Sequence, residues 1–124
     1  MTLFVIGKPI NHSLSPVIHN FWMEKYQIEL EYKKMEVEKD SLPSLIEKVR
    51  RREITGLNVT LPYKKDIIMY IDEISHTAKD IGAINTIFLK KNKVYGENTD
   101  GIGFTRSLEK QTKFNFYNKS IYIL

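Results

Sequence analysis

The hydrophobic positions of this chain recur with two different periods, and these periods predict strands that alternate with helices. Short apolar or alternating runs predict strands at 2–6, 32–37, 56–61, 86–89 and 94–97, with a last strand opening in 118–124. Spacings of three and four residues predict helices at 16–26, from 42, from 62 to 71, at 75–82 and from 100. This order indicates an α/β fold: a mostly parallel open sheet with one antiparallel strand from the hairpin, and helices on both faces.

The first two predicted helices carry one-sided apolar stripes. The first stripe consists of Val17, Ile18, Phe21, Trp22 and Tyr26, and the second of Leu42, Leu45, Ile46 and Val49. Ser15 is the predicted N-cap of the first helix, with Pro16 at its first position. Asp40 or Ser41 caps the second. Both segments are therefore predicted to be amphipathic helices.

Composition narrows the class of protein. A chain of 124 residues with 42% hydrophobic content is long enough for one domain with a single core. It has no cysteine, which excludes disulfides, thiolate nucleophiles and cysteine-based metal sites. No apolar stretch approaches the ~20 residues of a membrane span, and residues 3–6 are too short for a signal sequence. We expect a cytoplasmic protein without a membrane partner.

The formal charge of +4 and the pI of about 9.2 fit a nucleic acid, a membrane surface or an anionic small molecule as ligand. As a function, a basic nucleic-acid-binding domain ranks last of all the interpretations, because the basic residues are dispersed and no recognition motif is present. Salt-sensitive affinity for duplex or single strands would favour it.

The predicted strand at 56–61 places polar side chains at its end. Asn58 and Thr60 share one face, opposite Leu57, Val59 and Leu61, and the strand gives way to Pro62 and Lys64. Ligands of open α/β sheets gather outside the carboxyl ends of strands, which suits a site here. From this stretch alone, a simple solvated face is the stronger interpretation.

Two serines precede the first predicted helix. Ser13 and Ser15 lie in a loop that feeds a helix N-terminus, where free backbone N–H groups attract an anion such as a carboxylate. The alternative is a single N-cap at Ser15 with an idle Ser13, which is the more common use of serine. His12 and His19 lack a plausible set of further ligands, so no metal site is expected.

The segment 96–104, "GENTDGIGF", does not read as a dinucleotide fingerprint, because Arg106 stands where a third glycine is needed and a hairpin precedes it. Asp100 either caps the next helix or pairs with Lys64. Buried lysines can lower their pKa enough for proton transfer, but a neighbouring carboxylate favours the charged form and opposes that shift.

Four segments together point to a family. In order and spacing, "GKPINHSLSPVIHN", "GLNVTLPYKK", "GAINTI" and "GENTDGIGF" resemble the shikimate dehydrogenase family. The resemblance implies that 1–110 form the substrate-binding domain. It implies that 111–124 form a linker and the start of a truncated NADP-binding domain.

The resemblance also implies an activity and a set of site residues. The family reduces 3-dehydroshikimate reversibly to shikimate with NADPH, in aromatic amino acid biosynthesis. By this resemblance Ser13 and Ser15 hold the substrate carboxylate, Thr60 and Asn85 contact ring hydroxyls, and Asn58 orders the site. Lys64 and Asp100 flank the reacting oxygen, with which Lys64 exchanges a proton.

Glu97, where the family often has aspartate, is a mild departure, whereas the absence of an NADP-binding segment is a serious one. We expect that the chain alone does not turn over and binds shikimate weakly. A quinate/shikimate dehydrogenase and a non-catalytic shikimate-binding module remain as alternatives. The apolar end 121–124 could pair with another chain as an edge strand and form a homodimer.

Overall fold

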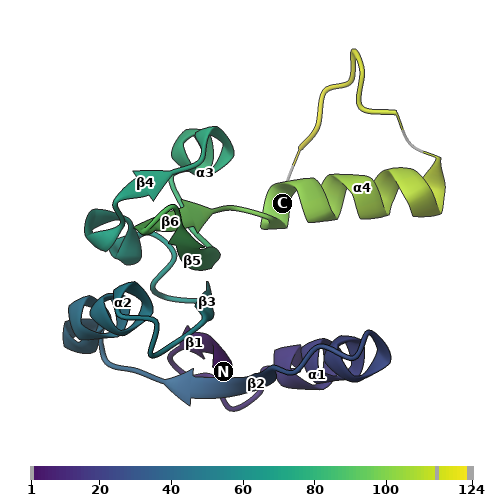
Figure 1. Cartoon of the computed structure of the whole chain (residues 1–124). Helices are drawn as coiled ribbons and strands as arrows, with labels where there is room; N and C mark the ends of the chain where they lie inside the picture. The colour runs from purple at the N-terminus through teal and green to yellow at the C-terminus, as the bar shows by residue number, and fades with distance from the viewer. Residues whose placement is uncertain (1, 114, 123–124) are drawn as a thin grey trace.

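A six-stranded mixed sheet is the centre of the fold, which a computed structural model describes for residues 2–113 and 115–122. The strands are β1 (Thr2–Gly7), β2 (Glu31–Glu36), β3 (Gly56–Val59), β4 (Glu73–Ile74), β5 (Thr86–Lys90) and β6 (Lys93–Glu97). Their order across the sheet is β2-β1-β3-β5-β6-β4 (Figure 1). β5 is antiparallel to β3 and β6, and the other described pairs are parallel. The predicted sheet with one antiparallel strand is confirmed.

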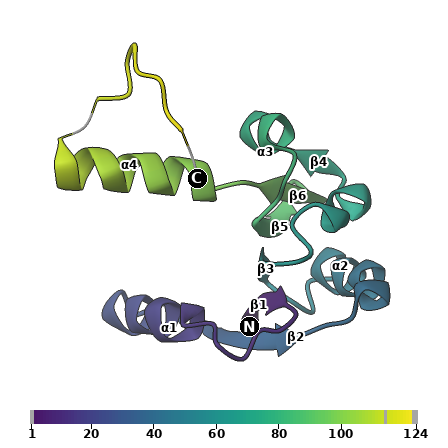
Figure 2. The same ribbon diagram turned by 180° about the vertical axis from the view of Figure 1, so that it is seen from behind.

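Helices lie on both faces of this sheet, as predicted (Figure 1). They are α1 (Ser15–Lys25), α2 (Leu42–Arg50), α3 (His76–Ile81) and α4 (Asp100–Thr112), with short 3-10 helices η1 (Lys39–Ser41) and η2 (Asp66–Tyr70). α1 packs against β2, and α4 projects from the sheet on the same side as α1, away from α2 (Figures 1 and 2).

The main hydrophobic core lies on the α2 side of the sheet. α2 buries its whole predicted stripe, and inward residues of β1, β3, β5 and β6 complete the same cluster. Ile6, Ile67 and Ile84 in this cluster are fully buried. Burial of such side chains stabilises a fold by roughly 1.5–3 kcal/mol each.

The apolar stripe predicted for the first helix is not buried by the described residues. Val17, Phe21 and Tyr26 are 69%, 56% and 62% exposed, and Met23 is the buried residue of α1. The opposite side of α1 makes the contacts with β2, where Asn20 and His19 meet Tyr32. The prediction of an α-helix is confirmed, but its apolar stripe faces away from the sheet.

The helix predicted from Pro62 is wrong. Residues 61–65 form turns, followed by η2. The Lys64 carbonyl accepts a hydrogen bond from the Ile84 N–H at 2.8 Å, so the Ile68 N–H bonds to the Lys65 carbonyl instead. A tertiary contact thus replaces a helical one. β3 likewise ends at Val59, two residues before the predicted end.

The chain after the sheet also differs from expectation. Residues 118–122 are not in a strand, so that part of the predicted final strand is wrong, and 123–124 lie outside the described residues. The homodimer suggested by that strand stays a prediction. The domain boundary at residue 110 also stays a prediction, and it would fall inside α4.

Candidate active site

Four chain segments meet at the end of the sheet from which α1 and α4 depart. They follow the carboxyl ends of β1, β3 and β6 and precede the amino end of β5, which shares this end because β5 is antiparallel. A hollow of about 290 Å³ lies there. It is lined by Val5, Ser15, His19, Asn58, Val59, Thr60, Lys64, Asn85, Thr99 and Asp100. The structure therefore brings six of the seven predicted site residues together.

Ser13, the seventh predicted residue, lines an adjoining hollow of about 400 Å³, which shares Val5, Ser15 and Thr60 with the first. Ser13 Oγ accepts a hydrogen bond from the Ser15 N–H at 3.3 Å. Ser15 is the first residue of α1, and Leu14 occupies the N-cap position of this helix. The predicted cap at Ser15 with an idle Ser13 is therefore wrong, because Ser13 accepts the free amide.

Lys64 and Asp100 form an ion pair inside the hollow. Lys64 Nζ lies 2.6 Å from Asp100 Oδ2, and the two side chains are 29% and 49% exposed. The backbone of Lys64 is fixed by the Ile84 N–H, one residue before Asn85. The ammonium is thus both held in place and open to a small molecule.

Asp100 does not cap α4 with its carboxylate. Asp100 Oδ2 faces Lys64 and Oδ1 accepts from Asn85 Nδ2 at 2.8 Å. The start of α4 is instead held by Asn98, whose Oδ1 accepts from the Asp100 N–H and whose Nδ2 donates to the Ala83 carbonyl. Asn98 is buried and was missed by the sequence interpretation, although asparagine before a helix is a recognised signal.

The side chain of Asn85 connects several polar groups of the site. Its Oδ1 accepts from the Thr99 N–H at 2.9 Å and from Thr86 Oγ1 at 3.0 Å, while its Nδ2 donates to Asp100. The residue is only 9% exposed. These contacts fix the orientation of the Asn85 amide, which in turn holds one oxygen of the Asp100 carboxylate.

Asn58 is half-buried and is bonded within the protein on both sides. Its Nδ2 donates to the Asn85 carbonyl and to Thr86 Oγ1, both at 3.1 Å, and its Oδ1 accepts from the Tyr32 hydroxyl at 2.7 Å. These contacts fit an ordering role for Asn58. Tyr32, Thr86 and Thr99 were not among the predicted residues.

Gly7 explains how the two halves of the site come so close. A Cβ at this position would lie 2.7 Å from the Leu61 carbonyl oxygen and from Thr60 Cγ2. The absence of a side chain at the end of β1 therefore lets the segment after β3 pack against it, which places Thr60 beside the serine loop.

Two kinds of cofactor site would be recognisable in the described residues: a cluster of metal ligands and a glycine-rich dinucleotide turn. No group of three or more histidine or acidic side chains in them could hold a metal ion. Gly101 and Gly103 lie inside α4 after an antiparallel hairpin, whereas the glycines of a dinucleotide fingerprint lie in the turn after a first parallel strand. Within the same ranges, no helix has the length and apolarity to cross a membrane.

Comparison with known proteins identifies the family of the chain. The family of the shikimate dehydrogenase substrate binding domain matches residues 5–87. The chain is 46% identical to a shikimate dehydrogenase (NADP(+)) of Pelagibacter ubique over 99% of its own length and 46% of the relative's. It is 53% identical to that of Clostridium beijerinckii over 81% of its own length and 37% of the relative's.

A solved structure of a shikimate 5-dehydrogenase from Thermus thermophilus, in complex with NADP(H) and shikimate, has the same fold. The TM-score is 0.83 at 35% identity, over 89% of this chain and 42% of that one. The chain thus spans less than half the length of these relatives. The resemblance seen in four sequence segments is confirmed, and the chain belongs to the shikimate dehydrogenase substrate-binding domain family.

Proposed function

We propose that this chain binds shikimate and 3-dehydroshikimate as the substrate-binding part of an NADP-dependent shikimate dehydrogenase. The proposal is carried by one observation: Lys64, Asp100 and Asn85 are in direct contact in a hollow that Ser15, Asn58 and Thr60 also line. The names of the relatives and the ligands in the Thermus thermophilus structure support it.

The two ends of the site suit the two ends of such a ligand. The hydroxyls of Ser13 and Ser15, at the positive end of the α1 dipole, bind the carboxylate. Thr60 and Asn85 bind ring hydroxyls. Because these groups are neutral donors and acceptors around a single ion pair, they favour a polyhydroxylated monoanion.

Lys64 is the proposed catalytic residue. Its ammonium donates a proton to the substrate's keto oxygen during reduction and takes it back from the hydroxyl during oxidation. Asp100 orients that ammonium, and Asn85 orients Asp100. NADP is bound outside this chain in the proposal, so the purified chain with NADP⁺ and shikimate produces no NADPH absorbance. A measurable rate would refute this part.

Binding is tested by titrating the chain with shikimate, using calorimetry and the amide resonances of Lys64 and Asn85. Lys64→Met is compared with Lys65→Met, which makes the same charge change at an exposed neighbour. Loss of a charge-assisted hydrogen bond predicts about 10- to 100-fold weaker binding for Lys64→Met. Lys65→Met should stay within about twofold, because surface charges contribute little.

Two results would contradict the proposal: neither heat nor resonance shifts with shikimate, or equal losses in both variants. A parallel titration with quinate separates the substrates. Tighter binding of quinate than of shikimate would favour the quinate/shikimate dehydrogenase alternative.

A further inference from the structure

A row of side-chain hydrogen bonds enters the site from a residue that the proposed mechanism does not use. Tyr32 lies on β2 and Asn58 on β3, with β1 between them. The Tyr32 hydroxyl nevertheless reaches Asn58 Oδ1 at 2.7 Å. From there the row continues through Thr86 and Asn85 to Asp100, with links of 3.1, 3.0 and 2.8 Å.

Backbone groups determine the direction of every link. Asn58 Nδ2 must face the Asn85 carbonyl, which only accepts, so Asn58 Oδ1 faces Tyr32 and the phenol must donate. Asn85 Oδ1 must face the Thr99 N–H, which only donates, so Asn85 Nδ2 faces Asp100. Thr86 Oγ1 accepts from Asn58 and therefore donates to Asn85.

Each donor in this row thus points toward the Asp100 carboxylate, and the Tyr32 hydroxyl is the first donor. A side-chain amide does not pass protons on readily, so the row holds groups in place rather than conducting protons. Hydrogen bonds in such a row strengthen one another, and a missing first donor leaves a buried acceptor unsatisfied.

Tyr32 itself is held from three directions. Asn20 of α1 pairs with both its backbone N–H and its carbonyl at 2.9 Å, as a neighbouring strand would. His19 stacks on its ring, with centroids 4.3 Å apart and planes 13° apart. The residue is 3% exposed, and burial raises the pKa of its phenol to about 12, against an opposing contact with Ser15. A side chain fixed in this way can impose its position on others.

We propose that Tyr32 is a positioning residue of the site, whose hydroxyl aligns Asn58, Thr86 and Asn85 and thereby the Asp100 carboxylate beside Lys64. Its effect on substrate rests on the proposed function. The alignment itself is a property of the free protein and can be measured without any ligand.

The test is Tyr32→Phe, with Tyr63→Phe as the matched control. Tyr63 is also 3% exposed, and its hydroxyl donates to the Val37 carbonyl at 2.8 Å, in the core on the other side of the sheet. Tyr32→Phe loses the part-buried hydrogen bond to Asn58 and the contact with Ser15, and Tyr63→Phe loses one buried hydrogen bond, so both should lower the melting temperature. Tyr32→Phe should also shift the side-chain amide resonances of Asn58 and Asn85 and weaken shikimate binding about three- to tenfold.

Tyr63→Phe should leave the Asn85 amide resonances in place and change shikimate binding by less than about twofold. An Asn85 shift no larger in Tyr32→Phe than in Tyr63→Phe would overturn the proposal. A shift at Asn85 in a protein that does not bind shikimate would support the aligned row and overturn the proposed function instead.

Thr86→Val breaks the same row in its middle. If the row acts as a unit, Tyr32→Phe combined with Thr86→Val shifts the Asn85 amide no further than Thr86→Val alone. Fully additive shifts would show that the two hydroxyls act separately, and the proposal would fall.

Discussion

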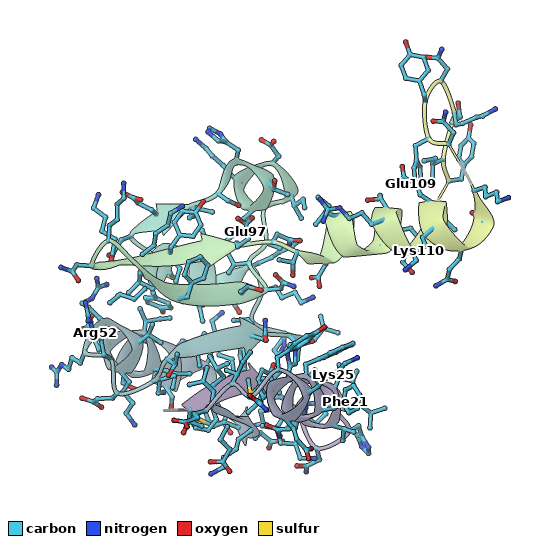
Figure 3. The ribbon with its side chains drawn as sticks, turned by 45° about the vertical axis from the view of Figure 1, so that its right-hand side comes forward. Phe21, Lys25, Arg52, Glu97, Glu109 and Lys110 are labelled. Atoms are coloured by element: carbon cyan, nitrogen blue, oxygen red, sulfur yellow. The ribbon has the colours of Figure 1, made fainter. Side chains whose placement is uncertain are left out.

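The helices α1 and α2 have similar sequence patterns and opposite surroundings. Each carries apolar residues three and four positions apart, yet α2 buries Leu42, Leu45, Ile46 and Val49 while α1 leaves most of its stripe exposed. Figure 3 shows Phe21 and Lys25 on the outer part of α1, where the Lys25 ammonium lies 6.0 Å from the Phe21 ring centre. Periodicity therefore predicts the helix and its apolar side, but not which side meets the sheet.

The physical difference lies in what each helix covers. α2 lies against the sheet and η2, where apolar side chains are available as partners. α1 lies beside the edge strand β2, whose outer N–H and C=O groups need hydrogen-bonding partners. Asn20 satisfies two of them at Tyr32, so polar residues face the sheet and the stripe faces outward.

The largest expected effect on stability comes from replacing a core isoleucine of α2. The same substitution on α1 is its control. Ile46 is 1% exposed on α2 and Ile18 is 54% exposed on α1. Ile46→Ala should lower the free energy of unfolding by about 2–5 kcal/mol, because it leaves a cavity in the core. Ile18→Ala should change it by less than about 0.5 kcal/mol. Urea unfolding measures both, and similar losses would contradict the comparison.

A smaller effect is expected from Asn20→Ala, which removes both side-chain bonds to the Tyr32 backbone. The loss should be about 1–3 kcal/mol, because two edge-strand groups lose their partner. Hydrogen exchange of the Tyr32 N–H should speed up accordingly. Asn11→Ala is the control, since its backbone carbonyl, rather than its side chain, accepts from Lys34 Nζ. Equal exchange at Tyr32 in both variants would speak against this attachment.

A still smaller effect concerns pH on the α1 side. Partial burial lowers the pKa of His19 below its usual 6.5, so the folded protein favours the neutral ring. Stability from this group is therefore fully present above pH 6.5 and is lost as pH falls through the lowered pKa. Thermal unfolding between pH 7 and 5 should show a decline that His19→Gln reduces. An unchanged decline would assign it to another group.

The α2 side should respond at lower pH. Hydrogen bonding to Arg50 lowers the pKa of Asp72 below its usual 3.8, and Arg50 Nη2 lies 3.0 Å from Asp72 Oδ1. Its stabilisation is present above pH 3.8 and is lost as pH falls through the lowered pKa. Asp72→Asn should make the stability of the protein less dependent on pH in that acidic range. The decline between pH 7 and 5 that is assigned to His19 should stay unchanged. A change in the upper range alone would contradict the assignment.

Much of the fold follows from local patterns, whereas parts of the site do not. Strand and helix signals predicted the single antiparallel strand, whereas the six predicted site residues that share a hollow were assigned by the family resemblance. The helix predicted from Pro62 is absent because the Lys64 carbonyl bonds to the Ile84 N–H, which is distant in the sequence. Tyr32 was missed because an aromatic residue on a strand looks like core, and its contact with Asn58 depends on pairing across β1.

The reversed strand β5 has one more consequence. Asn85 directly precedes β5 and Asp100 begins α4 shortly after β6, so the two residues flank one hairpin and no long crossover is needed to bring them to the same rim. The legs are joined by Lys91 and Asn92, both with positive φ, at the far end. Because side chains alternate along a strand, the length of that tight turn sets the register between β5 and β6. One inserted residue there would change which groups stand opposite each other at the rim.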